Sequence, residues 1–268
     1  MPLAVCATPI GNLDDVTLRV LRELAEADLV LCEDTRRTRT LLERHGIKAR
    51  TLSYHEHNEA ARVAKLLPRL QAGERIALVS DAGMPAINDP GARIIRAALD
   101  AGVPVEVLPG PSAVETALVA SGLAGERYQF LGYLPRSEKA KEALWRELER
   151  WPHPAVAFES PKRLPATLAG LALFDPEREL AVCRELSKHF EEVVRGRAGE
   201  LAETFEQEPK GEITLVIGPA SRESGEADEI AVAVVAELIA AGLPRRRAVE
   251  LVAKLAGVAR NRLYGRSL

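Results

Sequence analysis

The sequence has few of the features that mark several large classes of protein. It contains only three cysteines among 268 residues, Cys6, Cys32 and Cys183, an odd number placed far apart. This usage excludes a disulfide framework or a zinc ribbon and favours a reducing compartment. Cys6 and Cys32 lie in apolar, strand-like runs, so we expect these two thiols to be buried. The net charge is −3, so the chain as a whole is no polycation. A nucleic-acid partner would therefore have to be bound by local basic patches.

Long apolar runs are also missing. The longest, residues 230–243, is interrupted by Glu237 and is too short to span a bilayer. No basic and apolar leader opens the chain, so we expect a cytoplasmic protein with no membrane partner. The balance of 47% hydrophobic and 28% charged residues is typical of a globular protein, and 268 residues suffice for one large domain or two ordinary ones.

The usual signatures of a phosphate-binding loop are absent as well. The chain opens with an apolar run, the loop TPIGN at residues 8–12 and a helical stripe, an order found in many nucleotide sites. Yet this loop contains neither G-x-G-x-x-G nor G-K-[ST]. We therefore expect a ligand without phosphates that is bound largely by backbone groups.

Strand-like and helical segments alternate along the chain. Strands are expected over residues 3–7, 27–34, 75–83, 104–113, 155–160, 179–186 and 211–219. This alternation predicts an α/β fold with mostly parallel sheets. We expect two α/β domains, a linker and a helical segment, over residues 1–115, 116–220, 221–227 and 228–268 in that order.

Four loops that follow predicted strands combine Gly and Pro with small polar residues. They are TPIGN (8–12), EDTRRT (33–38), SDAGMPAINDPG (80–91) and PGPSA (109–113). Glycine lets the backbone approach a ligand closely, and proline fixes the shape of the loop. Any one of them could be an ordinary turn. Because ligands of such sheets bind outside the carboxyl ends of the strands, four together predict a site.

At these loops the chain resembles the tetrapyrrole-methylase superfamily, whose members bind S-adenosyl-L-methionine in a cleft between two α/β domains. With HEHN (55–58), FESPKRL (158–164) and RELSKHFEE (184–192), the loops are similar to one branch, which methylates the ribose 2′-oxygen of a cytidine in 16S rRNA. The similarity covers about residues 3–220 and departs at Met84 and Ser187, where the branch has threonine. It implies an S-adenosyl-L-methionine-dependent rRNA methyltransferase that acts on 16S rRNA or the 30S subunit and forms a homodimer.

The resemblance also implies which residues hold the cofactor. They belong to the first loop, the loop after Ser80, the start of a helix and the second domain: Ile10, Asp81, Gly83, Ser112, Ala113, Phe158 and Ile213. Apolar and carbonyl groups suit the adenine and the sulfonium. Backbone N–H groups at the helix start, where Ser112 is the expected N-cap, suit the methionine carboxylate.

Methyl transfer to a ribose hydroxyl is an in-line displacement that needs alignment and removal of a proton. Candidate proton acceptors are Glu33, Asp34, His55, His57, Glu185 and Lys188. We favour Asp34 and Lys188 as catalytic residues, with Glu33 and Glu185 as alternatives, because Arg36 would keep the neighbouring Asp34 ionised. Two simpler interpretations stay open: Glu33 or Asp34 as the cap of the next helix, and Lys188 with Glu185 as a surface ion pair.

Other residues are candidates for contact with RNA. Arg36 and Arg37 follow a predicted strand closely, and His55 and His57 lie on one side of an extended segment. The spacing of the two histidines is compatible with a metal, but no third ligand at metal spacing is apparent. We therefore expect no metal and assign these four residues to RNA.

The C-terminal segment is basic. Between Arg245 and Leu268, seven Lys or Arg residues oppose a single acid, Glu250. The small residues from Ala253 to Leu263 predict a helix-turn-helix after a Gly-Leu-Pro turn. We favour a phosphate-binding module over a helical cap that aids dimerisation. Its expected RNA contacts are Arg245, Arg246, Arg247, Arg260 and Arg262.

Two other functions stay open beside the rRNA methyltransferase. The first is a methyltransferase for a small tetrapyrrole, against which the HEHN and EDTRRT segments and the basic C-terminus count. The second is an RNA-binding protein without turnover, against which the intact Gly- and Pro-rich loops count.

Overall fold

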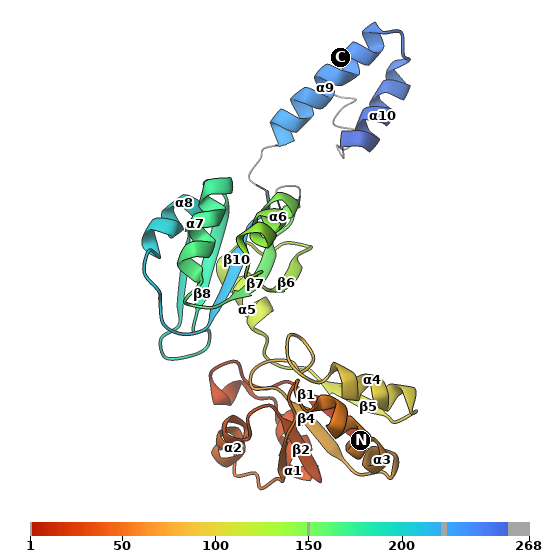
Figure 1. Ribbon diagram of the computed structural model, residues 1–268, viewed down its shortest axis with the longest axis vertical. Helices are drawn as coiled ribbons and strands as arrows, with labels where there is room; N and C mark the ends of the chain where they lie inside the picture. The colour runs from red at the N-terminus through yellow and green to blue at the C-terminus, as the bar shows by residue number, and fades with distance from the viewer. Residues whose placement is uncertain (1, 149–150, 221–223, 257–268) are drawn as a thin grey trace.

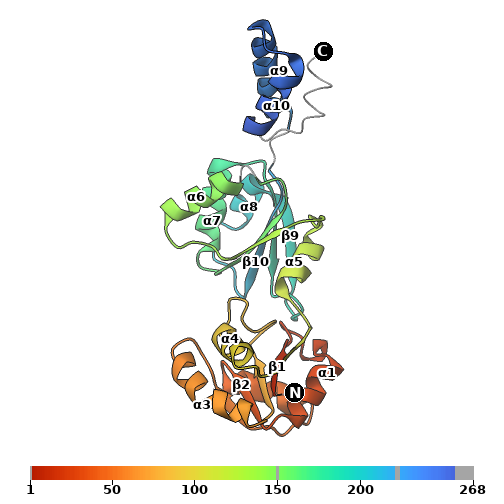
Figure 2. The ribbon, with the colours of Figure 1, turned by 90° about the vertical axis from the view of Figure 1, so that its right-hand side faces the viewer.

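Two five-stranded sheets covered by helices make up most of the chain, and a helix pair follows them (Figure 1). The computed structural model describes residues 2–148, 151–220 and 224–256. The two sheets and the helix pair follow one another along the long axis in chain order (Figures 1 and 2). The predicted two-sheet α/β architecture is confirmed.

The first sheet is parallel, in the order β3-β2-β4-β1-β5. Its strands are β1 (Leu3–Cys6), β2 (Leu29–Cys32), β3 (Thr51–Ser53), β4 (Ile76–Val79) and β5 (Val105–Leu108). β1, β2 and β4 are buried along their whole length, because parallel strands with helices on both faces have no side open to water. This burial explains why the sequence shows continuous apolar runs there.

Helices cover the two faces of the first sheet in pairs. They are α1 (Leu18–Glu26), α2 (Thr35–Arg44), α3 (Glu59–Gln71) and α4 (Ala92–Asp100), with the short 3₁₀ helix η1 (Leu13–Asp15) before them. Ala4 and Cys6 of β1 lie in the core beneath α1 and α2, whereas Leu3 and Val5 lie in the core beneath α3 and α4. Successive residues of a strand point to opposite faces, so one short strand supplies both cores.

The second sheet is mixed, in the order β6-β7-β10-β8-β9. Its strands are β6 (Gln129–Tyr133), β7 (Ala155–Glu159), β8 (Glu179–Arg184), β9 (Glu192–Arg197) and β10 (Ile213–Ile217). β6 and β7 are parallel, whereas β10 runs antiparallel to β7 and β8, and β8 runs antiparallel to β9. The expectation of mostly parallel sheets therefore holds for the first sheet but not for the second. The short turn 185–191 between β8 and β9 can only join antiparallel neighbours.

Two cores flank the second sheet. One face packs against α6 (Glu138–Leu148), α7 (Leu164–Phe174) and α8 (Ala198–Thr204), through side chains such as Trp145, Leu168 and Leu201. The other face packs against α5 (Ala113–Ser121). Ile10, from the loop after β1, joins this second core and ties the N-terminal loop to the second sheet.

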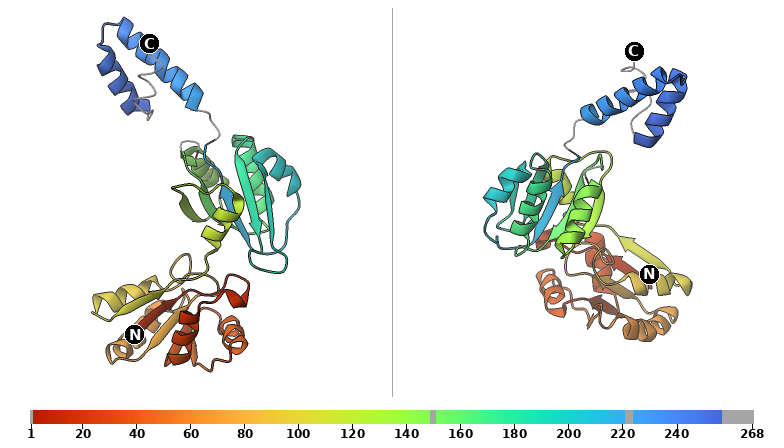
Figure 3. Two further views of the ribbon diagram at one scale, coloured as in Figure 1. Left: turned by 180° about the vertical axis from the view of Figure 1, so that it is seen from behind. Right: turned by 45° about the horizontal axis from the view of Figure 1, so that its top comes forward.

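The C-terminal helices α9 (Ser224–Ala240) and α10 (Arg245–Ala256) pack on each other around Val235, Val249 and Val252. The pair stands apart from both sheets in the two views of Figure 3. α9 begins inside the segment that was expected as a linker, and the turn 241–244 matches the predicted Gly-Leu-Pro turn. The third helix of the predicted helix-turn-helix lies outside the described residues. Within the described part of the chain, no helix is both long and apolar enough to cross a membrane.

All three cysteines are free and buried, and the burial of Cys6 and Cys32 was expected from the apolar runs that contain them. Cys6 and Cys32 lie in the core beneath α1 and α2, and Cys183 lies beneath α5. Burial raises the pKa of the Cys6 thiol to about 12 and that of Cys183 to about 11. They are therefore unreactive core residues.

Candidate functional site between the two sheets

The loop after β1 and the loop after β4 are joined to each other at the edge of the first sheet. The N–H of Thr8 donates to the carbonyl of Gly83 at 2.9 Å, and the N–H of Gly83 donates to the carbonyl of Thr8 at 3.0 Å. The Thr8 hydroxyl also donates to the Ser80 carbonyl at 3.0 Å. Gly83 has a φ of 78°, a backbone conformation that residues with a Cβ atom rarely adopt. This arrangement explains why the sequence places glycine and small polar residues there.

A cavity of about 560 Å³ lies between the two sheets. Its lining comes from the loops of the first sheet, from the start of α5 and from β7 and β10. All seven residues that the family resemblance implied for cofactor binding are in this lining: Ile10, Asp81, Gly83, Ser112, Ala113, Phe158 and Ile213. The fold therefore brings together residues that are up to two hundred positions apart in the chain.

The wall formed by the second sheet is aromatic and apolar. The ring of Phe158 meets the rings of Phe130 and Tyr133 edge to face, with centroids 5.1 and 5.5 Å apart. Phe158 of β7 lies opposite Thr214 of the neighbouring strand β10. Ile213, the residue before Thr214, also lines the cavity. Such a wall suits the flat face of a heteroaromatic ring. Tyr133 was missed at the sequence level because β6 gave no clear strand pattern.

The start of helix α5 forms part of the cavity wall. Ser112 is its N-cap, as predicted, but the hydroxyl donates to the Glu115 carboxylate and caps no backbone N–H. Ser112, Ala113 and Val114 line the cavity. The first N–H groups of a helix have no partner inside the helix, and the helix dipole favours negative charge there. This helix start is therefore suited to a carboxylate.

Three carboxylates, Glu33, Asp81 and Asp89, form an acidic part of the cavity wall. Burial and the nearby Asp81 raise the pKa of Glu33. Burial and the nearby Glu33 raise the pKa of Asp89 to about 6, despite a lowering contribution from the Ser80 hydroxyl. Burial and neighbouring negative charges disfavour the ionised form of a carboxyl group, and a bound cation would favour it. Asp89 lies in the loop 80–91 that was expected at the site, but it was not singled out, because its character depends on burial and on Glu33 from another loop.

Asp34 caps helix α2. Its carboxylate accepts from the Arg36 N–H at 2.8 Å and from the Arg36 guanidinium at 2.7 Å, which lowers the pKa of Asp34 to about 2. The side chain is not among the residues that line the cavity. Its own backbone N–H instead donates to Asp81 Oδ1 at 2.9 Å. The contacts of Asp34 are thus those of a helix cap. Its low pKa also makes the Asp34 carboxylate a weak proton acceptor.

Lys188 is held by two carboxylates from loops of the second sheet, Glu185 just after β8 and Glu212 just before β10. Its Nζ lies 2.8 Å from Glu185 Oε1 and 3.0 Å from Glu212 Oε2. Burial opposes the charge, but these hydrogen bonds outweigh it and raise the pKa of Lys188. The bond from Lys188 also lowers the pKa of Glu185. Lys188 and Glu185 thus both stay charged at neutral pH. Glu212, which lines the cavity, was not singled out from the sequence.

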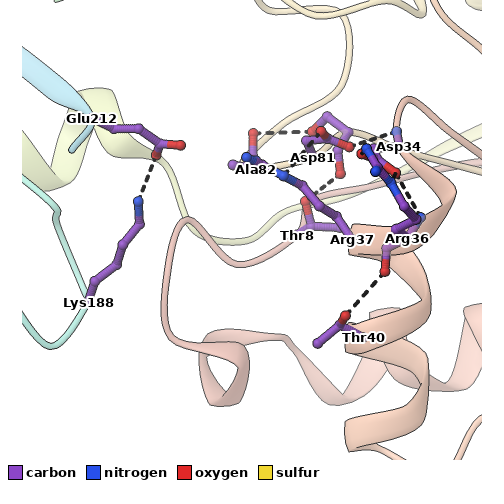
Figure 4. A network of polar contacts seen from close by, with 10 residues as sticks. Thr8, Asp34, Arg36, Arg37, Thr40, Asp81, Ala82, Lys188 and Glu212 are labelled. Atoms are coloured by element: carbon purple, nitrogen blue, oxygen red, sulfur yellow. Dashed lines mark hydrogen bonds and ion pairs between the residues drawn. The ribbon is translucent and has the colours of Figure 1, made fainter. Parts of the chain in front are cut away.

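A second cavity, of about 280 Å³, adjoins the first. Figure 4 shows the Lys188–Glu212 pair on one side of this region, with Thr8, Arg37 and Asp81 on the other. The Gly11 backbone lies against residues 186–188, in the turn between β8 and β9. A Cβ at that position would lie 2.5 Å from Lys188 Cγ and 2.8 Å from the Leu186 carbonyl oxygen.

The residues assigned to RNA lie in two regions. Arg36 and Arg37 are exposed on the first turns of α2, and Arg37 lines both cavities. The rings of His55 and His57 lie 5.9 Å apart, edge to face, in the loop after β3. Among the described residues, no group of three His, Cys, Asp or Glu side chains is arranged to hold a metal ion. Arg245, Arg246 and Arg247 form the first turn of α10, whereas Arg260 and Arg262 lie outside the described residues.

Sequence comparison places the chain among methyltransferases. The family of tetrapyrrole (corrin/porphyrin) methylases matches residues 2–202. A relative from Mesorhizobium japonicum, named ribosomal RNA small subunit methyltransferase I, is 42% identical over 99% of this chain and 91% of its own length. A relative of the same name from Thermotoga maritima is 43% identical over 80% of this chain and 97% of its own length.

Solved structures share the fold. The methyltransferase CobJ has a TM-score of 0.63 at 19% identity, covering 82% of this chain and 94% of that one. A Thermus thermophilus uroporphyrin-III C-methyltransferase, complexed with S-adenosyl homocysteine, has a TM-score of 0.57 at 22% identity and covers 82% of this chain and 98% of that one. The overall fold of the two α/β units is thus common to these proteins.

Proposed function

We propose, on the premise that the chain belongs to the tetrapyrrole (corrin/porphyrin) methylase family, that it methylates a ribose 2′-oxygen of a cytidine in 16S rRNA. Within that family the chain belongs to the ribosomal RNA small subunit methyltransferases I. The methyl donor is S-adenosyl-L-methionine. The observation that carries the proposal is the similarity, over nearly the full chain, to relatives of that name. The cavity between the sheets supports it with a lining of the right chemistry.

The residues of the larger cavity fit S-adenosyl-L-methionine. When bound, this cofactor supplies an activated methyl group on a positively charged sulfur. The aromatic wall around Phe158 can hold the adenine, and the start of α5 beside Ser112 can hold the methionine carboxylate. The acidic part of the wall, with Glu33 and Asp89, complements the sulfonium charge. Each group of the cofactor thus has a matching part of the wall.

In this proposal Asp81 takes the proton from the ribose hydroxyl. The Asp34 N–H orients one oxygen of Asp81, and the Arg37 guanidinium lies 3.7 Å from the other. A carboxylate held in this way keeps lone pairs free for a hydroxyl in the cavity. Asp34 and Lys188, expected to be catalytic from the sequence, become positioning residues: Asp34 holds Asp81, and Lys188 holds Glu212.

The basic start of α10 binds the RNA backbone in this proposal. Three arginines in the first turn of a helix oppose the helix dipole, which favours negative charge at that end. Glu250 pairs with Arg246 at 3.5 Å and with Arg247 at 4.0 Å, so one carboxylate faces two of the guanidinium groups. Phosphates at this surface would relieve the excess positive charge and position the RNA without reading its bases.

The proposal extends to assembly and compartment. We expect a homodimer, because β5 is an edge strand of the first sheet and its Val107 side chain is 55% exposed. We expect the cytoplasm as its compartment, because its three buried cysteines are all free thiols. Light scattering coupled to size exclusion measures the oligomeric state, and a monomer would contradict the first expectation.

Incubation with radiolabelled S-adenosyl-L-methionine tests the function. The acceptors are naked 16S rRNA, 30S subunits from a strain lacking this activity, and uroporphyrinogen III as a tetrapyrrole. We expect label in rRNA, in a dinucleotide that resists alkali because a 2′-O-methyl group prevents strand cleavage. Label confined to the tetrapyrrole, or to an alkali-sensitive nucleotide, would refute the proposal.

A further inference from the structure

The two cavities between the sheets share one wall. Ile10, Arg37, Asp81, Ala82 and Glu212 line both of them. A molecule in the larger cavity and another in the smaller one would therefore meet at these residues. This is the geometry that a transfer between two bound molecules requires, because the reacting atoms must be held within about 3–3.5 Å of each other.

The two cavities differ in chemistry. The larger one has aromatic rings, a helix start and the acidic side chains described above. The smaller one is lined by Thr8, Thr38 and Thr40 and by the cations Arg37 and Lys188, and none of the described residues in its lining is aromatic. The Thr8 and Thr40 hydroxyls donate to backbone carbonyls and can still accept a hydrogen bond. Hydroxyl and cationic side chains are typical contacts of sugar and phosphate groups.

The two cations of the smaller cavity are not equivalent. Lys188 is hydrogen-bonded to two carboxylates, so its charge is already balanced. Arg37 Nε lies 3.7 Å from Asp81 Oδ2, which is too long for a hydrogen bond, and its side chain is 59% exposed. The charge of Arg37 also acts on Glu33, but among the described residues its guanidinium donates no hydrogen bond, so it can still donate to a ligand.

We infer that the smaller cavity receives the ribose and phosphate of the nucleotide to be methylated, with Arg37 bound to its phosphate and Asp81 beside its 2′-hydroxyl. This inference rests on the proposed function. The volume of about 280 Å³ lies below the range of about 300–1,000 Å³ that is usual for a complete drug-sized ligand. It suits one sugar–phosphate unit and is too small for a tetrapyrrole. The nucleotide must then leave the RNA stack, as in other enzymes that modify single nucleotides.

Filling the smaller cavity tests the inference. Thr40 is exposed on α2, lines the smaller cavity and is not in the lining of the larger one. We expect Thr40→Trp to lower kcat/KM for 30S subunits about 100-fold or more, while the Kd for S-adenosylhomocysteine by calorimetry stays within about twofold. Arg39→Trp, on the same helix but outside both linings, is the matched control. Equal activity of the two variants, or an equal loss of S-adenosylhomocysteine binding, would overturn the inference.

Removing the free guanidinium gives a second test. We expect Arg37→Ala to raise KM for the RNA about tenfold and to reduce the salt dependence of RNA binding by about one phosphate contact. Arg39→Ala removes the same charge from the same helix and controls for long-range attraction. If both variants behave alike, Arg37 does not bind the phosphate and the inference is wrong. A wild-type enzyme that labels the tetrapyrrole and not rRNA would instead refute the proposed function itself.

Discussion

Asp89→Asn should stabilise the free protein at neutral pH. Burial and the neighbouring Glu33 raise the pKa of Asp89 from its ordinary value of 3.8 to about 6. The neutral carboxyl therefore stabilises the fold below a pH of about 4, and this contribution is lost as the pH rises through about 6. The full difference corresponds to about 3 kcal/mol at neutral pH. Because Asp89 is only partly buried, solvent screening reduces the expected gain to about 1–2 kcal/mol.

Denaturant unfolding at two pH values measures this gain. We expect Asp89→Asn to raise the free energy of unfolding at pH 7.5, and we expect about one third of that gain at pH 4.5, where the wild-type carboxyl is protonated in the folded protein. Asp100→Asn, a carboxylate 58% exposed on α4, is the control and should change stability by less than about 0.5 kcal/mol. An unchanged or lower stability of Asp89→Asn at pH 7.5 would refute the reasoning.

The same substitution should weaken binding of the charged cofactor. The Asp89 carboxylate belongs to the acidic wall of the larger cavity, which we propose faces the sulfonium. Loss of one charge should raise the Kd for S-adenosyl-L-methionine about fivefold to tenfold and leave that for the uncharged thioether S-adenosylhomocysteine within about twofold. Calorimetry with both ligands gives the ratio. Equal effects on the two would show that Asp89 does not act on the sulfonium.

Three further predictions concern other parts of the molecule. Gly11→Ala should lower both stability and activity, because the added Cβ would lie 2.8 Å from the Leu186 carbonyl oxygen, and backbone cannot move aside as a side chain can; an unchanged melting temperature would contradict this. Asp81→Asn should lower kcat about 100-fold, whereas Asp34→Asn, which keeps a helix-capping side chain, should stay within about threefold; rates on 30S subunits decide between them. The triple variant Arg245→Ala, Arg246→Ala and Arg247→Ala should weaken RNA binding about tenfold or more and flatten its salt dependence, with S-adenosylhomocysteine binding unchanged; filter binding at several salt concentrations measures this.

The sequence predicted the first half of the fold better than the second. Buried parallel strands such as Leu3–Cys6 and Ile76–Val79 stand out as apolar runs between helical patterns. β9 (Glu192–Arg197) is a charged edge strand, and β6 is interrupted by a bulge near Gly132, so neither gave a clear pattern. The antiparallel pairs of the second sheet come from β10, which lies between β7 and β8, and from the short turn that joins β8 to β9.

Part of the candidate site also followed from the sequence. The loops at the ends of β1, β2, β4 and β5 were recognisable by their glycine and proline content, and the identity of their ligand came from the resemblance to a family. Asp89 and Glu212 were missed, because their chemical character depends on neighbours from other loops. Burial and nearby charge set a carboxyl pKa, and neither can be read from the local sequence.

The apolar strands, the loops that follow them and the basic C-terminus could be recognised from residue patterns alone, with β6 and β9 as the exceptions. How the loops meet depends on the packing of the whole chain. This packing places Ile10 in the core beneath α5, Gly11 against Lys188, and Asp81 on the wall shared by two cavities. The physical reason is that periodicity and turn chemistry act over a few residues, whereas a cavity is formed by packing between segments up to about two hundred residues apart.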